Sequence, residues 1–227
     1  MNKYIDVKLP NLQLLSGILD APLTFVDLET TGMVHERHFA IIEIGLVHIT
    51  PNKIEEKSSL VYPGMKIPPH ISDITHIYDD MVKGKPAFDY FAKYMSNVAD
   101  SHIFCGFNSK TFDSKALEKM LSKNNFNQQF KNQIDFRHVF LRCRKNFQGI
   151  HSQAGSLVQA CAYHNIFVDG QAHRASYDIA ITAMLAEKLL EKYGFGIVHK
   201  EVEKFQDAYI KKQYYQHIVI NRVSPIF

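Results

Sequence analysis

The sequence TFVDLETTG at residues 24–32 ends an apolar strand with two acids, Asp27 and Glu29. Side chains at positions i and i+2 of a strand point to the same face, so these two carboxylates project together. Like charges at that spacing repel each other unless a positive charge lies between them. The pair is therefore typical of a divalent-cation site, although a solvated strand end gives the same pattern.

Two further acids lie on the apolar faces of predicted helices. Asp178 precedes Ile181 and Leu185 at helical spacing, and Asp113 precedes Leu117 in the same way. A carboxylate on a core-facing stripe is costly unless it is paired or bound to a metal. Each acid alone is more typical of a helix start, where it interacts with free N–H groups, than of a metal ligand. Convergence of all four acids on one sheet edge would favour the metal-binding interpretation.

The order of the predicted elements indicates an α/β fold, with a mixed β-sheet flanked by helices. The first three strands are expected to form an antiparallel meander. The strands are predicted at residues 23–28, 40–49, 58–62 and 103–107, and the helices from residue 86 and at residues 113–121, 136–144, 152–164, 176–193 and 200–213.

One main domain is expected over residues 21–193. Residues 1–20 form an N-terminal lead-in, and residues 194–227 form a C-terminal extension that packs on the domain or binds a partner. The helix that precedes this extension ends at Gly194, as is usual for a glycine after a helix.

Composition indicates a globular intracellular protein. The chain has 227 residues, 46% of them hydrophobic, and its formal charge of +3 is too small to predict a nucleic-acid partner by itself. Its cysteines, Cys105, Cys143 and Cys161, are odd in number and lie in apolar segments, which is typical of reduced core residues. No stretch resembles a signal peptide or a membrane span, so a cytoplasmic location without membrane association is expected.

Three motifs carry a resemblance to the DEDD 3′–5′ exonuclease superfamily over residues 22–192. Asp27 to Gly32 resembles its first motif and Asn108 to Asp113 its second. The segment from His173 to Asp178 is similar to the third motif in its histidine version. This histidine places the chain with the DEDDh (DnaQ-like) group, which includes polymerase proofreading subunits, exodeoxyribonuclease X and ribonuclease T. One residue departs from the pattern, because Phe107 stands where the second motif usually has histidine.

The resemblance implies a fold, a cofactor and a set of residue roles. The fold would be RNase H-like, and the cofactor would be two Mg²⁺ ions, for which Mn²⁺ can substitute. The catalytic and metal-binding acids would be Asp27, Glu29, Asp113 and Asp178, with His173 as the general base. The terminal nucleotide would be bound by Leu28, Thr30, Thr31 and Asn108.

The predicted function is a metal-dependent 3′–5′ exonuclease, a phosphodiester hydrolase that releases nucleoside monophosphates from single-stranded 3′ ends. DNA is favoured over RNA, which would suit a role in DNA repair. Two alternatives stay open at this point: an exoribonuclease of the ribonuclease T kind, and a non-catalytic nucleic-acid-binding or polymerase-associated module. A polymerase partner and a homodimer also both stay open.

Overall fold

A mixed five-stranded sheet forms the centre of the molecule in the computed structural model, which describes residues 8–151, 155–167, 170 and 172–220. The strand order is β3-β2-β1-β4-β5. Strands β1, β2 and β3 pair antiparallel, while β4 and β5 continue the sheet parallel to β1. The predicted α/β class, the mixed sheet and the antiparallel meander are confirmed. The strand bounds are Leu23–Thr30 (β1), Ile41–Thr50 (β2), Lys53–Leu60 (β3), Ile103–Gly106 (β4) and Gln133–Asp135 (β5).

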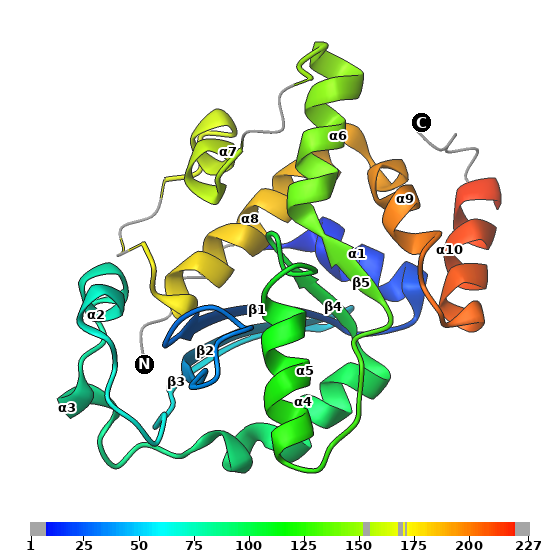
Figure 1. The fold of residues 1–227 in the computed structure, drawn as a ribbon. Coiled ribbons are helices and arrows are strands. Elements are labelled where there is room, and N and C mark those ends of the chain that lie inside the picture. Colours follow the sequence, from blue (N-terminus) through cyan, green and yellow to red (C-terminus); the bar gives the residue numbers. More distant parts are fainter. Residues whose placement is uncertain (1–7, 152–154, 168–169, 171, 221–227) are drawn as a thin grey trace.

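Helices cover both faces of this sheet (Figure 1). Alternation along β1 sends Phe25 into one hydrophobic cluster and Val26 into another. Phe25 packs with the face that carries the long helix α8, whereas Val26 packs with α4 and α5. Asp27 and Glu29 continue the Phe25 side of the strand and therefore face α8. The helix bounds are Pro10–Leu19 (α1), Pro69–Thr75 (α2), Asp79–Val82 (α3), Phe88–Ser101 (α4), Asp113–Lys123 (α5), Phe136–Gln148 (α6), Leu157–Tyr163 (α7), Ala175–Tyr193 (α8), His199–Val202 (α9) and Ala208–Ile220 (α10), with a 3₁₀ turn at Phe195–Val198.

Both ends of the described chain contribute to the core on the α8 face. Leu12 and Leu15 of α1 are fully buried there, together with Val202 of α9 and Tyr214 of α10. The Tyr214 hydroxyl donates a hydrogen bond to the carbonyl oxygen of Phe195 at 2.9 Å. The lead-in and the extension thus share one hydrophobic cluster with α8, while the domain boundaries at residues 20/21 and 193/194 stay predictions.

Several elements differ from the bounds expected from the sequence. Strand β3 starts at Lys53, five residues earlier than predicted, because an edge strand with exposed polar side chains lacks an apolar alternation signal. Strand β5 and the short helices α2 and α3 were not predicted, since each is too short to show a period. Helix α7 starts at Leu157 behind a Ser156 capping box, and residues 152–154 of the predicted helix lie outside the described residues.

The predicted helix at residues 200–213 is instead two helices with a break between them. Phe205 in the break is buried, and the Asp207 carboxylate accepts hydrogen bonds from the backbone N–H groups of Tyr209 and Ile210 at 2.8 and 3.1 Å. This carboxylate caps a new helix, α10, in the usual manner of an N-terminal aspartate. Core burial of Phe205 and the cap together explain why the chain does not continue straight from α9.

None of the helices in the described part of the chain has both the length and the apolar character that a bilayer crossing requires.

Candidate active site

Asp27 and Glu29 lie near the end of β1 on the face that α8 covers. The residues opposite them on β2 are Gly45 and Glu43. A β-bulge between Glu29 and Thr30 then ends the regular ladder. Both carboxylates are half-buried, as the period of the strand predicts for side chains between a sheet and a helix.

The start of α8 brings Asp178 to these two acids. Gly45 permits this approach, because a Cβ atom at this position would lie 2.4 Å from the Ala175 carbonyl oxygen. One carboxylate oxygen from each of Asp27, Glu29 and Asp178 lies within 4.8 Å of the other two. Within the described residues, these three acids form the group with spacing suited to a metal ion.

Burial and mutual repulsion disfavour the ionised form of these carboxyls. Burial raises the pKa of Asp27 well above its ordinary value, and the charges of Asp113 and Asp178 raise it further. Burial also raises the pKa of Glu29 to about 8, with added repulsion from Asp178 and Glu43. The Asp178 carboxyl reaches a pKa of about 6 through burial, although the backbone amide and imidazole of His173 oppose the rise. Such a cluster gains stability from any cation that neutralises it.

Asp113 begins α5 and is buried beside this group without belonging to it. Burial raises its pKa to about 8; its own backbone amide and that of Leu28 oppose the rise, while the charge of Asp135 adds to it. Its charge acts on both Asp27 and Glu29, so all four predicted acids share one electrostatic environment.

His173 contacts the acid cluster through its backbone N–H group. Its N–H group donates a hydrogen bond to Asp178 Oδ2 at 3.0 Å, from a left-handed conformation with φ of 60°. The imidazole is exposed and lies outside the group of three acids. The described geometry therefore gives His173 an anchoring contact to Asp178, and its role as general base stays a prediction.

Glu43 and Arg174 form an ion pair at this site that the sequence did not identify as such. Glu43 is 2% exposed, and its carboxylate accepts hydrogen bonds from Arg174 Nε at 3.0 Å and Nη2 at 2.9 Å. The backbone N–H of Ala175 adds a third at 3.0 Å. The guanidinium compensates the charge that Glu43 places opposite Glu29, and it also fixes the first turn of α8. An acid inside the apolar run at residues 41–45 was the available signal.

The predicted nucleotide-contacting residues of the first motif are already engaged within the protein. Leu28 is buried in the cluster on the α4 and α5 face. The Thr30 hydroxyl donates to the carbonyl oxygen of Gly32 at 2.9 Å, and the Thr31 hydroxyl accepts from the backbone N–H of Ala40 at 3.0 Å. These bonds close the connection between β1 and β2. Contact with a nucleotide stays a prediction for all three residues.

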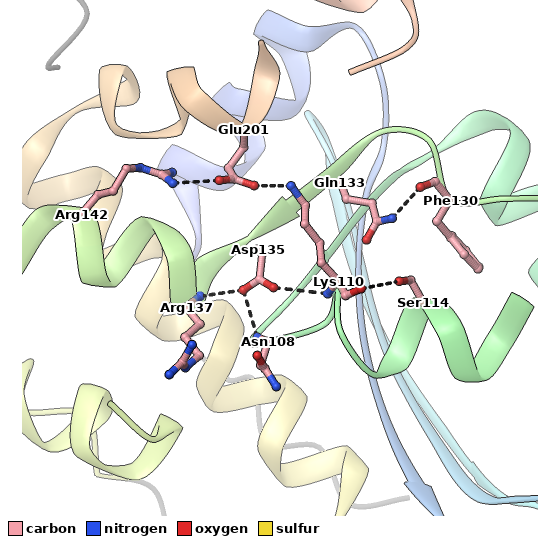
Figure 2. A network of polar contacts seen from close by, with 9 residues as sticks. All are labelled: Asn108, Lys110, Ser114, Phe130, Gln133, Asp135, Arg137, Arg142 and Glu201. Atoms are coloured by element: carbon pink, nitrogen blue, oxygen red, sulfur yellow. Dashed lines mark hydrogen bonds and ion pairs between the residues drawn. The ribbon is translucent and has the colours of Figure 1, made fainter. Parts of the chain in front are cut away.

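The second-motif loop between β4 and α5 is held by Asp135, a fully buried residue at the end of β5 (Figure 2). Its carboxylate accepts hydrogen bonds from the backbone N–H groups of Asn108 at 2.9 Å, Lys110 at 3.2 Å and Arg137 at 3.0 Å. Asn108 adopts a φ of 65°, and its exposed side chain extends away from Asp135 (Figure 2). Asp135 thus shapes the loop that leads to Asp113. No sequence signal singled it out.

A family model described as an exonuclease, that of the RNase T family, matches residues 24–186. The match covers all four acids and His173. The chain belongs to the DnaQ-like 3′–5′ exonuclease family. It is thereby a phosphodiester hydrolase, and its family is dependent on divalent metal ions.

Relatives of this exonuclease support the assignment. DNA polymerase III subunit epsilon of Aquifex aeolicus is 29% identical over 206 residues, which are 86% of this chain and 96% of the relative. The 3′-5′ exonuclease DinG of Staphylococcus saprophyticus is 31% identical over 172 residues, 74% of this chain, but the match spans only 18% of that protein.

A solved structure shares the fold of the exonuclease. Exonuclease I of E. coli, crystallised with a dT13 oligonucleotide, superposes with a TM-score of 0.66 at 17% identity. The superposition covers 81% of this chain and 45% of Exonuclease I. This comparison confirms the RNase H-like arrangement expected from the sequence.

Proposed function

We propose that this exonuclease uses Mg²⁺ to remove nucleoside monophosphates from the 3′ ends of single-stranded DNA. The observation that carries the proposal is the convergence of Asp27, Glu29 and Asp178 within 4.8 Å beside buried Asp113. All their donors are carboxylate oxygens, which suit the hard cations Mg²⁺ and Mn²⁺ better than softer metals. Burial, and then repulsion among the acids, raises the pKa of Asp27 and of Glu29, and a bound cation would offset both effects.

The spacing of Asp27, Glu29 and Asp178 suits a metal ion, and we propose that the four acids together hold a pair of divalent ions. Asp27, Glu29 and Asp178 would hold them, with Asp113 completing the set. Bound ions of this kind lower the pKa of a water molecule and neutralise charge on the phosphate and on the departing 3′-oxygen.

The other proposed roles belong to His173 and to the residues around the terminal nucleotide. A ring nitrogen of His173 would accept the proton of the attacking water, a role for which histidine is the side chain used most often. Its exposed imidazole is accessible to a substrate, while its backbone N–H keeps Asp178 in position. Leu28, Thr30, Thr31 and Asn108 remain the proposed contacts of the last nucleotide, and Asn108 is the exposed member of this set.

The proposed preference for DNA rests on the names of a related protein and of a structural neighbour. One relative is a subunit of DNA polymerase III, and the Exonuclease I structure contains a DNA oligonucleotide. The first of these also makes a polymerase the proposed partner of this chain. An exoribonuclease is the second candidate, because the matching family model carries the name RNase T.

A digestion assay tests the proposal directly. Matched 5′-labelled single-stranded DNA, duplex DNA and RNA are incubated with the protein and Mg²⁺. We expect a ladder that shortens from the 3′ end, fastest on single-stranded DNA, and no cleavage in EDTA. Faster cleavage of RNA would favour the exoribonuclease, and no cleavage of any substrate would favour a non-catalytic module.

Two variants separate the roles of the site residues. Asp27→Asn should abolish cleavage, and His173→Ala should lower kcat by about 10²- to 10⁴-fold, the usual contribution of a general base. The control is Glu191→Gln on the exposed far end of α8, which should retain full activity. Full activity of Asp27→Asn or His173→Ala would remove that residue from the mechanism.

A further inference from the structure

A groove of about 290 Å³ between α6 and the turn after α9 is lined mainly by basic side chains. Its basic residues are His138, Arg142, Lys145, His151 and Lys204, and no acidic side chain lines it within the described part of the chain. The other two described lining residues, Leu141 and Ile150, are aliphatic. A concave surface of this composition favours anions, and the N–H groups of its lysine and arginine side chains are the usual donors to phosphate oxygens.

A buried acid connects this groove to the second-motif loop (Figure 2). Glu201 of α9 is fully buried, and its two carboxylate oxygens pair with Arg142 Nη1 at 2.9 Å and with Lys110 Nζ. Because one carboxylate holds two cations, Lys110 and Arg142 are fixed next to each other, with 21% and 28% of their side chains exposed. Lys110 precedes Asp113 by three residues, so the loop that leads to this predicted metal ligand also carries one of the two cations.

The outer lysines of the groove lack acidic partners in the described part of the chain. Some exposed lysines elsewhere pair with an acid, as Lys188 does with Glu191 at 2.8 Å. Lys145 and Lys204 are exposed, and neither forms an ion pair with a described residue. Arg142 and Lys145 are three residues apart on α6 and lie on neighbouring turns, about 4.5 Å apart along the helix axis.

We propose that this groove binds the phosphate backbone of the substrate strand, several nucleotides away from its 3′ end. The inference rests on the proposed function and extends it, because it adds a second contact region remote from the acids. Continuity with the Lys110 loop favours a strand that enters from the acid cluster over an isolated small anion. Contacts with phosphates alone would make this binding independent of sequence and dependent on salt.

The test compares short and long substrates. The variant is the double substitution Lys145→Gln/Lys204→Gln, and the substrates are a dinucleotide, which reaches only the acid cluster, and a long single-stranded oligonucleotide. The affinity for the long strand is measured in EDTA by fluorescence anisotropy over a range of salt concentrations. Cleavage of both substrates is measured with Mg²⁺. The matched control is Lys93→Gln/Lys131→Gln, which removes two exposed lysines that do not line the groove.

We expect the variant to cleave the dinucleotide like wild type and to bind the long strand more weakly. Loss of two phosphate contacts should reduce the slope of log K against log salt by about 1.4 and weaken binding at 0.1 M salt by roughly 25-fold. The control should match wild type in both measurements.

Three results would overturn the groove proposal. These are an unchanged affinity and salt slope for the long strand, an equal loss on the dinucleotide, and an equal loss in the control. An unchanged affinity and salt slope would instead favour a different negatively charged ligand for the groove, such as an acidic protein surface. Failure of wild type to cleave either substrate would instead refute the proposed function, so the two failures are distinguishable.

Discussion

Replacing Glu29 by glutamine should stabilise the metal-free protein at pH 8 and change its stability little at pH 5. Glutamine resembles the protonated form of this side chain and cannot ionise. In the folded protein, burial and the charges of Asp178 and Glu43 raise the pKa of Glu29 to about 8 from an ordinary 4.5. The folded state therefore binds the proton more tightly than the unfolded state, and wild type loses stability as pH rises between these two values.

The magnitude follows from the two pKa values. Integrated over pH, the penalty for Glu29 is below about 1 kcal/mol at pH 5 and about 4 kcal/mol at pH 8. The second figure is an upper value, because the neighbouring acids titrate together with Glu29. For a chain of this size it corresponds to an increase of about 10 °C in Tm.

Denaturant unfolding in EDTA at the two pH values measures this difference. Glu29→Gln should gain stability over wild type at pH 8 alone, and the control Glu191→Gln should match wild type at both. With Mg²⁺ at about 100 times its Kd, wild type should gain about 2.7 kcal/mol at pH 8, more than the variant, since binding to the folded state adds to its stability. An equal change in unfolding free energy at both pH values, or no change at pH 8, would refute this reasoning. It would mean that neither burial nor the neighbouring acids raise the pKa of Glu29.

Two further predictions concern the buried ion pairs. Burial opposes ionisation of Glu201, but Lys110 and Arg142 outweigh it and hold its pKa below the ordinary value. Glu201→Gln should therefore lower the free energy of unfolding by about 2–3 kcal/mol at pH 7. The difference from wild type should disappear as pH falls through the pKa of Glu201. A difference that persists in acid would contradict the ion-pair explanation. Arg174→Met leaves the Glu43 carboxylate buried without its cation, so urea unfolding should show a loss of about 3 kcal/mol. Arg174→Lys should restore only part of it, because an ammonium group cannot reproduce the two parallel bonds; full restoration would show that charge alone matters.

Local periodicity was sufficient to predict much of the acid cluster. The strand period placed Asp27 and Glu29 on one face, and the helical period placed Asp113 and Asp178 toward the core. The structure brings three of these acids together and buries the fourth beside them. These placements depend on neighbours within a few residues, which is the range over which a sequence pattern is informative.

Polar pairs between distant residues were beyond the reach of such patterns. Glu43 and Arg174 are separated by 131 residues, and Lys110 and Glu201 by 91. Strand β5 places Asp135 under the second-motif loop, yet three residues carry no recognisable period.

The sequence by itself determined the α/β class, the exonuclease motifs and the acids that share a face, since each is encoded in local spacing. Only the tertiary structure decided which cations compensate the buried acids, that the Thr30 and Thr31 hydroxyls close a loop, and that the C-terminal extension supplies the Glu201 carboxylate that pairs with Lys110 and Arg142. These features depend on where separate segments meet in three dimensions, because a charge is stabilised by its neighbours in space and not by those along the chain.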